Sequence, residues 1–394
     1  MERKSAYILS AVRTPIGGYG GAFSEVGAVQ LGATAIQCAV ERSAVDPGAI
    51  ESVIMGNVLS ANLGQAPARQ AGLKAGLANE VCATTVNKVC ASGLKAISML
   101  WQDILLNQTS VGVAGGMESM SQAPFYVPNA RFGLGYGNKE LIDALAKDGL
   151  TDVYNQCSMG VCGDQTAEKL NISREEQDDF AEQSYRKSAD AWKEGNFSTE
   201  VVEIKVPQKK GDPINVAEDE EFKKVNFEKL RSLKPAFSPG GTVTAASSSP
   251  MSDGASAMVL AGEDFVRHTE PLARIVAYAE AEQEPMLFTT TPVAATRKVL
   301  ERAGLSLSDI DFFEVNEAFA VVALAYIRLL NIDPEKVNAF GGAVALGHPI
   351  GASGARILTT LTTVLRAKKA RYGLAAICNG GGGASAMIIE NLKQ

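Results

Sequence analysis

The sequence predicts an α/β protein built from two related halves, with a further region inserted in the first half. Apolar strand-like runs alternate with amphipathic helix-like segments toward both ends of the 394-residue chain, a pattern typical of a parallel, helix-covered sheet. Short segments also recur in the same order: ASGLKAI at 91–97 and ASGARIL at 352–358, GVAGG at 112–116 and GLAAI at 373–377, and Ile50 and Ile310. Their offsets are nearly equal (352 − 91 and 373 − 112 give 261, and 310 − 50 gives 260). Halves related in this way are expected to pack back to back and share a central cleft.

The elements follow in order along the first half. We predict a strand at 6–11, an amphipathic helix at 30–42, a strand at 50–55 and a helix at 66–77. An extended segment then leads into a long helix near residue 90, and a buried strand follows at 110–120. Region 121–250 is richer in proline, asparagine and charge, and its strong helix begins with the capping box Ser173 to Glu176. After 271 the strand and helix alternation resumes. We therefore predict a first half of 1–120 plus 250–271, an inserted domain of 121–249 and a second half of 272–394.

Composition and charge exclude several classes of partner. The net charge of −7 provides no global basic field for nucleic acid or an anionic membrane, and no apolar run reaches the roughly 18 residues of a membrane span. The N-terminal stretch leads directly into the first strand without a signal-peptide or transit-peptide pattern. We expect a cytoplasmic protein, with a processed form in the mitochondrial matrix as the alternative.

The cysteines indicate free thiols. Six cysteines are scattered along the chain without the close spacing of a secreted disulfide framework. Cys157 and Cys162 are five residues apart, but no second pair and no histidine accompany them. This spacing argues against a zinc site.

One of the two histidines stands in a glycine-rich loop. His268 lies in the charged run EDFVRHTE, whereas His348 lies in GGAVALGHPIGASG, where small side chains leave backbone amides open to a ligand. The repeat places the His348 loop opposite Cys90, each at the start of a helix. Helix N-termini carry unpaired amides and partial positive charge, so we expect a lowered pKa and nucleophilic reactivity for Cys90. The alternatives are a histidine that caps a helix and a cysteine that fills the core.

Two further polar residues end predicted strands. Cys378 precedes four glycines and is either a second reactive thiol or a core residue. Asn316, in FFEVNEAFA, either caps a helix or holds a water in the cleft.

The motifs NKVCASGLKA, GGMESMS, NEAFA, GGAVALGHPIGASGAR and CNGGGGASAM resemble signatures of the thiolase family, and the resemblance covers essentially the whole chain. NVLSANLGQAPARQ and TVTAASSS resemble its acetoacetyl-CoA branch. The resemblance implies a duplicated, five-layered αβαβα fold with a loop domain that covers CoA. It also implies the reversible Claisen condensation of two acetyl-CoA to acetoacetyl-CoA plus CoA through an acetyl-Cys90 intermediate, as part of lipid metabolism and the mevalonate pathway.

Site roles also follow from the resemblance. Cys90 is implied to be the nucleophile, His348 its activator and an oxyanion donor, Cys378 the acid and base, and Asn316 the holder of a water. The backbone amides of Cys90 and Gly380 are implied to form a second oxyanion hole. The residues implied to bind CoA are Met159, Phe237, Ala246, Ser249 and Phe319, with Lys224 and Lys229 near its 3′-phosphate. No cofactor is required; a potassium ion, as in the mitochondrial type, would be bound by Tyr185, Ala245, Ala246, Ser248 and Val344. A homo-oligomer is implied, a tetramer or else a dimer.

Two departures from the family pattern bear on the acyl chain. Many relatives have a histidine where this chain has Ser158, and many have N-x-N-G-G where this chain has Asn338-Ala339-Phe340-Gly341-Gly342. We expect both to affect acyl-chain preference, and Phe340 to be a point of difference from relatives. Two alternative functions stay open: a degradative 3-ketoacyl-CoA thiolase for longer chains, and an inactive CoA- or lipid-binding protein with the same fold.

Overall fold

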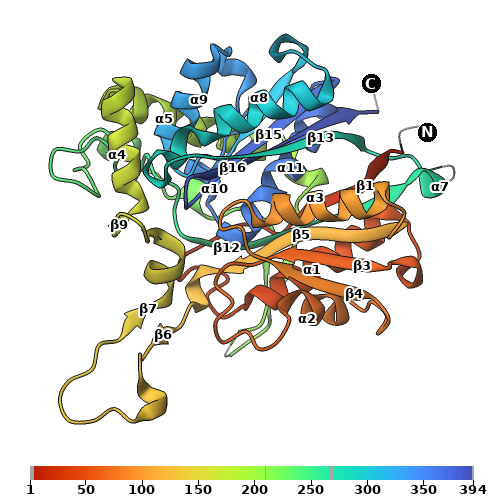
Figure 1. Cartoon of the computed structure of the whole chain (residues 1–394), viewed down its shortest axis with the longest axis horizontal. Helices are drawn as coiled ribbons and strands as arrows, with labels where there is room; N and C mark the ends of the chain where they lie inside the picture. The colour runs from red at the N-terminus through yellow and green to blue at the C-terminus, as the bar shows by residue number, and fades with distance from the viewer. Residues whose placement is uncertain (1–3, 209, 267–268, 393–394) are drawn as a thin grey trace.

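The computed structural model describes residues 4–208, 210–266 and 269–392, so His268 lies outside it. Ten strands of this part form one mixed sheet (Figure 1): β1 Ala6–Arg13, β2 Gly17–Gly18, β3 Ser52–Gly56, β4 Cys82–Val86, β5 Val111–Ser119, β12 Ser252–Gly262, β13 Ala273–Glu282, β14 Phe312–Val315, β15 Tyr372–Asn379 and β16 Gly383–Asn391. The longer helices are α1 Ala28–Ser43, α2 Pro67–Lys74, α3 Ser92–Leu105, α4 Met159–Leu170, α5 Arg174–Lys193, α8 Thr291–Ala303, α9 Ala320–Leu330 and α11 Ile350–Ala367. The short helices are α6 Phe227–Leu230, α7 Glu263–Val266 and α10 Ala343–Leu346.

The predicted internal repeat is confirmed. The sheet runs in the order β14-β15-β16-β13-β1-β12-β5-β3-β4. Its first half, β1-β12-β5-β3, has the same order as its second half, β13-β16-β15-β14. The recurring sequence segments fall at equivalent places, in α3 and α11, in β5 and β15, and just before β3 and β14. The two halves meet where β1 pairs with β13 at Tyr7 and Arg274 and at Ile8 and Ala273.

The predicted parallel sheet is wrong. Among the described strands, β3 runs parallel to β4 and β5, and β14 runs parallel to β15, but the five central pairings are antiparallel. One cause is the glycine run after Cys378. Gly381 and Gly382 have φ angles of 89° and 93°, a region that glycine enters without steric cost. They therefore reverse the chain tightly, and β16 returns beside β15 without a crossover helix.

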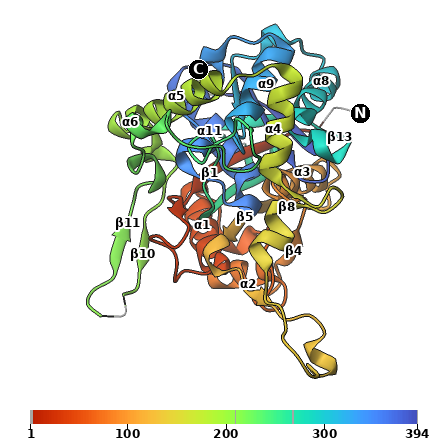
Figure 2. The same ribbon diagram turned by 90° about the vertical axis from the view of Figure 1, so that its left-hand side faces the viewer.

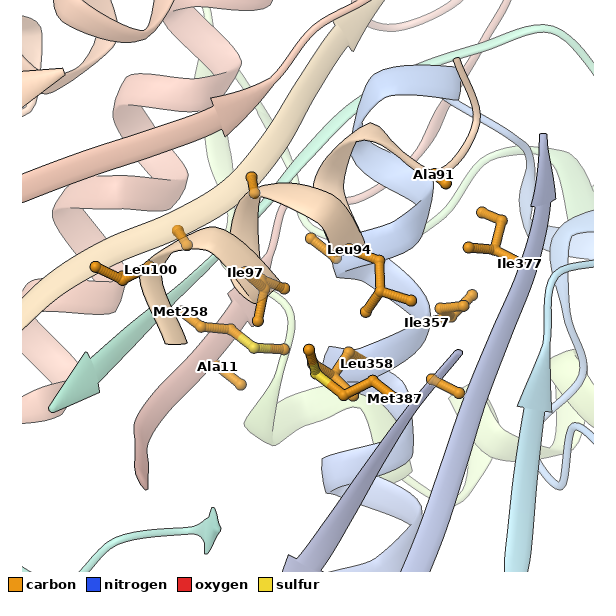
Figure 3. Packing of buried hydrophobic residues seen from close by; sticks show 14 of the residues in the cluster. Ala11, Ala91, Leu94, Ile97, Leu100, Met258, Ile357, Leu358, Ile377 and Met387 are labelled. Atoms are coloured by element: carbon orange, nitrogen blue, oxygen red, sulfur yellow. The ribbon is translucent and has the colours of Figure 1, made fainter. Parts of the chain in front are cut away.

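The five-layered arrangement implied by the resemblance is also confirmed. Helices α1 and α2 cover the outer face of the first half, and α8 covers the outer face of the second half. Helices α3 and α11 form the middle layer and pack against strands of both halves. Figure 3 shows Leu94 and Ile97 of α3 close to Ile357 and Leu358 of α11, with Met387 from β16 beside them.

Glycines set the distance between the two central helices. A Cβ atom added at Gly354 of α11 would lie 2.5 Å from the backbone nitrogen of Leu94, and one added at Gly93 of α3 would lie 2.8 Å from the backbone nitrogen of Ala355. Cβ atoms do not approach other atoms so closely. The ASG motif that recurs in both halves therefore supplies the glycine that each helix needs at the crossing.

The chain between β5 and β12 carries α4, α5 and two projecting ribbons. The ribbons are β6 Phe125–Tyr126 with β7 Ile142–Asp143, and β10 Ile204–Val206 with β11 Ile214–Val216; a third short pair is β8 Thr151–Asp152 with β9 Cys157–Ser158. Both ribbons extend away from the body of the molecule (Figure 2). The predicted capping box is confirmed: the Glu176 backbone N–H donates to Ser173 Oγ at 3.1 Å, and the Ser173 backbone N–H donates to Glu176 Oε2 at 2.7 Å. Within the described ranges, no helix has the length and apolar character that a bilayer span requires.

We expect Gly354→Ala to lower the free energy of unfolding by about 1–3 kcal/mol, because the added methyl group overpacks the helix crossing. Gly72→Ala is the matched control, since Gly72 also lies in a helix but a Cβ atom there meets its nearest neighbour at an ordinary 3.5 Å. That change should raise the free energy of unfolding by about 0.5–1 kcal/mol. Denaturant unfolding measures both, and equal effects would contradict the importance of the crossing.

Candidate active site

A cavity of about 530 Å³ lies where the two halves and the inserted region meet. Cys90 and His348 line it from the starts of α3 and α11, and Gly380 lines it from the loop after β15. Apolar side chains supply most of the remaining wall, among them Val89, Leu150, Met159, Phe237, Phe288, Phe319 and Ile350. A largely apolar cavity with a few convergent polar groups is the usual form of a small-molecule site.

Cys90 is presented by a strained turn between β4 and α3. Val89 has a φ angle of 48°, which is a rare conformation for a β-branched residue. Hydrogen bonds from both sides fix it: the Val89 backbone N–H donates to Asn87 Oδ1 at 2.9 Å, and Ser92 Oγ donates to the Val89 carbonyl at 2.6 Å. The thiol consequently stands at the cavity wall, although its residue is 92% buried.

The predicted lowering of the Cys90 pKa is wrong. Burial raises the pKa of the Cys90 thiol to about 12, while hydrogen bonds from the backbone N–H groups of Gly380 and of Cys90 itself lower it in part. The two amides do favour the thiolate, as a helix start should, but the loss of solvent outweighs them. Cys90 is therefore a neutral thiol at neutral pH and needs a base during its attack.

His348 is arranged to be that base. Its Nδ1 lies 2.5 Å from Ser353 Oγ, and Ser353 Oγ donates to the Pro349 carbonyl at 2.9 Å. The serine proton is thus engaged, so Nδ1 carries a proton and donates it, which leaves Nε2 as the acceptor. Nε2 is buried and has no hydrogen-bond partner in the described part of the chain. Burial, with the nearby charge of Arg356, lowers the pKa of His348 to about 3, so the ring is neutral at physiological pH.

The alternative roles proposed for His348 and Asn316 do not fit the structure. Helix α11 has Pro349 as its N-cap residue, without a side-chain capping bond. Helix α9 begins at Ala320 with Phe319 as its N-cap residue, so Asn316 does not cap it. Both polar atoms of the Asn316 side chain are buried and have no partner among the residues described. An amide in this state fits a bound water, because buried polar groups are almost always hydrogen-bonded.

Cys378 is the second thiol at this site. It lies near the end of β15, is fully buried, and belongs to the apolar cluster that includes Phe319. Burial first, and then the proximity of Cys90, raise the pKa of Cys378 well above its ordinary value. Cys378 is not among the residues that line the cavity, whereas Gly380, two residues further along the chain, lines it together with Cys90.

The residues predicted to bind CoA divide into two groups. Met159, Phe237, Ser249 and Phe319 line the cavity, whereas Ala246 does not and its neighbour Ala245 does. Neither Lys224 nor Lys229 lines it. Lys224 Nζ lies 2.8 Å from a Glu220 oxygen and 2.7 Å from a Glu221 oxygen, so carboxylates already neutralise its charge. Lys229 is exposed at the surface.

The residues predicted to bind potassium converge in part. Tyr185 and Val344 pack together in one buried cluster, and Ala245 and Ser248 line the neighbouring cavity. A phenol oxygen and backbone carbonyls are suitable ligands for a hard cation. No group of three or more His, Cys, Asp or Glu side chains suited to a metal occurs in the described ranges.

The two departures from the family pattern lie in different places. Ser158 lines the cavity, as expected. Phe340 does not: it is 97% buried in a separate apolar cluster, where its ring packs edge-on against Phe197 at 5.9 Å between centroids. The Phe340 ring therefore lies in the core and not in the cavity wall, and its effect on acyl-chain preference stays a prediction.

Two supporting residues were not singled out from the sequence. Ser353 orients the His348 ring. The motif ASGAR, in which Ser353 lies, does not indicate this role. Glu118 is a fully buried carboxylate that accepts hydrogen bonds from Asn57 Nδ2 at 2.8 Å and from the backbone N–H of Gly351 at 2.9 Å. Burial raises the pKa of Glu118 to about 7. The sequence did contain a sign of Glu118, because an acidic residue is unusual within a buried strand such as GGMES.

A neutral thiol, an oriented imidazole and bare backbone amides around one cavity define a cysteine-dependent acyltransferase. Family models agree with this class: the thiolase N-terminal domain matches residues 6–264 and the thiolase C-terminal domain matches residues 269–391. The chain belongs to the thiolase family.

Individual relatives cover the whole chain. It is 49% identical to a cytosolic acetyl-CoA acetyltransferase of Gibberella zeae, over 98% of both chains. It is 52% identical to a mitochondrial acetyl-CoA acetyltransferase of Homo sapiens, over 99% of this chain and 91% of the relative. Among solved structures, a thiolase from Ascaris suum in complex with coenzyme A superposes with a TM-score of 0.94 at 45% identity, over 99% of this chain and 100% of that one.

Removing the Ser353 hydroxyl should impair the base without unfolding the site. We expect Ser353→Ala to lower kcat by about 10–100-fold, a part of the roughly 10²–10⁴-fold that a positioned general base contributes. Thr363→Ala is the control, because Thr363 also donates its hydroxyl to a carbonyl within α11, at 3.3 Å, but lies away from the cavity. Steady-state kinetics on both variants, with thermal melting as a check on folding, distinguish orientation of His348 from general stability; equal kcat losses would contradict the role.

Proposed function

We propose that this protein is an acetyl-CoA C-acetyltransferase, which condenses two acetyl-CoA to acetoacetyl-CoA plus CoA and also runs in reverse. The observation that carries the proposal is that Cys90, His348 and Gly380 line one apolar cavity, with the buried thiol of Cys378 two residues before Gly380. Relatives named acetyl-CoA acetyltransferase at about half identity over the full chain support the substrate.

In the first half-reaction, Cys90 takes the acetyl group. As its sulfur attacks the thioester carbonyl, the thiol proton passes to His348 Nε2, which is neutral and has no other hydrogen-bond partner among the described residues. The bond from the carbonyl carbon to the CoA sulfur breaks, Cys378 gives its proton to that sulfur, and CoA leaves as a thiol while Cys378 remains as a thiolate. Amides of Cys90 and Gly380 are suited to stabilise the oxyanion on the acetyl carbonyl.

In the second half-reaction, a new carbon–carbon bond forms. Cys378, left as a thiolate by the first half-reaction, removes a proton from the methyl carbon of the next acetyl-CoA, and the resulting carbanion attacks the acetyl carbonyl on Cys90. His348 Nε2 and a water on Asn316 are suited to stabilise the enolate oxygen, because both are buried and otherwise unpaired within the described residues. The bond from the carbonyl carbon to the Cys90 sulfur then breaks, and this sulfur takes back the proton that His348 holds.

Several finer assignments belong to the same proposal. We assign Ala246, Lys224 and Lys229 to the outer part of the CoA site, and potassium to Tyr185, Ala245, Ala246, Ser248 and Val344. We also propose a role in lipid metabolism through the mevalonate pathway, in the cytoplasm or, as a processed form, in the mitochondrial matrix. Relatives of both compartments support either location. The domain boundaries at 121–249 and 272–394 stay a prediction.

Acetylation of Cys90 is the direct test. Incubation with acetoacetyl-CoA, followed by digestion and mass spectrometry, should give a peptide acetylated on Cys90. Cys90→Ala should abolish both acetylation and turnover while CoA still binds, because the acyl acceptor is gone and the cavity remains.

Other outcomes of the same experiment favour the alternatives. Unchanged turnover in Cys90→Ala would overturn the mechanism, and CoA binding by a wild-type protein without turnover would support a binding protein. Faster turnover of a sixteen-carbon than of a four-carbon 3-ketoacyl-CoA would support the degradative thiolase.

We further propose a homotetramer assembled through the ribbon β6–β7. Its tip carries apolar side chains that a monomer would leave in water, including Phe132 at 89% exposure, Leu134, Tyr136 and Leu141. Exposed apolar patches of this kind mark association surfaces. Phe132→Asp with Tyr136→Asp should reduce the mass measured by light scattering from that of a tetramer to that of a dimer. Leu106→Asp, an exposed apolar residue after α3, should leave it unchanged; a wild-type dimer would refute this assembly.

A further inference from the structure

Two thiols flank the first turn of α4. Ser158 is the N-cap residue of this helix, so Cys157 directly precedes the cap and Cys162 is the fourth helical residue. Side chains at these two positions pack against each other in many helices, in the contact called the hydrophobic staple. Here Cys162 is fully buried, and the half-buried Cys157 packs against the same apolar cluster. The staple of α4 is therefore a pair of free thiols that pack in one apolar cluster.

A carboxylate with a free oxygen adjoins this pair. Asp152 of β8 is the strand partner of Cys157 and is 98% buried. Its Oδ1 accepts hydrogen bonds from the backbone of Tyr154 and Asn155, whereas Oδ2 has no partner among the described residues. Burial first, then Cys157 and Asp152, raise the pKa of Cys162 to about 12. Cys162 therefore remains protonated, with an acceptor nearby for the proton it would release.

The staple borders the acyl-CoA cavity. Ser158, Met159 and Gly160, which lie between the two thiols in sequence, all line the cavity. Gly160 is pressed against Phe237, since a Cβ atom there would lie 2.2 Å from the ring. A covalent link across the staple would consequently fix the cavity wall made by these residues.

We propose that Cys157 and Cys162 are a modification site at which a peroxide oxidises the two thiols to an intramolecular disulfide. The more accessible Cys157 sulfur attacks the peroxide oxygen, the O–O bond breaks, and a sulfenic acid and one water result. The Cys162 sulfur then displaces the hydroxyl group from Cys157 and transfers its proton by way of Asp152, so a second water leaves. The two thiols lose two electrons and the peroxide gains them. A half-exposed thiol beside a resolving thiol is the arrangement of redox-responsive sites.

The disulfide should change substrate binding more than chemistry, because it constrains the wall and leaves Cys90, His348 and Cys378 in place. This consequence rests on the proposed function, whereas formation of the disulfide does not. We expect the KM for acetoacetyl-CoA to change about tenfold, within the range that a small misplacement of positioning groups costs, and to return when the disulfide is reduced.

Thiol mapping tests the chemistry without any assay of turnover. Full-length Cys90→Ala protein is treated with hydrogen peroxide, its free thiols are alkylated, and trypsin releases residues 148–169, which carry both cysteines on one peptide. We expect this peptide to become lighter by two hydrogen atoms and to resist alkylation before the exposed Cys82 is oxidised. Oxidation of Cys82 while both staple thiols stay open to alkylation would overturn the proposal.

Kinetics on the protein with Cys90 intact test the consequence. The reversible change in KM should be absent from Cys157→Ser and from Cys162→Ala, and present in Cys82→Ser. Cys157→Ser changes a half-buried residue, so it remains informative if the buried Cys162→Ala unfolds. A change in KM that persists in Cys157→Ser would assign the effect to another thiol and overturn the link to α4. A protein without turnover that still forms the disulfide would refute the proposed function alone.

Discussion

The backbone contact between α3 and α11 is the constraint on which the site depends. Gly93 and Gly354 let the two helices approach more closely than any side chain would allow. Gly351 of α11 also packs directly against the backbone of β5. A Cβ atom added at Gly116 of β5 would lie 2.1 Å from the carbonyl oxygen of Gly351. Cys90 lies just before one helix and His348 just before the other. The distance between nucleophile and base is therefore set by close packing of main chain, which resists small displacement.

Buried charge attaches the inserted region to this core. Arg13 at the end of β1 pairs with Glu200 at 2.6 Å and with Asp219 at 2.7 Å, and all three side chains are fully buried. Such pairs add little net stability, because desolvation offsets the attraction, but loss of one partner leaves an uncompensated charge. Asp219 also accepts a hydrogen bond from the backbone N–H of Ile16 at 2.8 Å. The neighbouring Glu221, which lines the cavity, is thereby kept in position.

Sequence reasoning succeeded where the information was local or repeated. The ASG motif at two places identified both central helices, and the spacing from Ser173 to Glu176 fixed the start of α5. It failed for features that depend on tertiary packing. Alternating strands and helices do not reveal that β16 folds back on β15. Local sequence does not report how deeply Cys90 is buried, and burial reversed its expected pKa shift. Phe340 aligns with a site motif, yet its side chain points into the core.

Several features that cost folding free energy lie together at the active site. Val89 at a φ angle of 48° costs about 1–3 kcal/mol. The Asn316 amide and His348 Nε2 are buried without a protein partner among the described residues, and each would cost about 1–3 kcal/mol if no water or substrate met it. Local bonds alone do not offset these costs. These unfavourable features persist because the helix crossing and the buried ion pairs of Arg13 fix the surrounding chain, which prevents a less strained conformation. A bound water or substrate satisfies the two polar groups, and the same packing that holds the Val89 turn positions Cys90 for reaction.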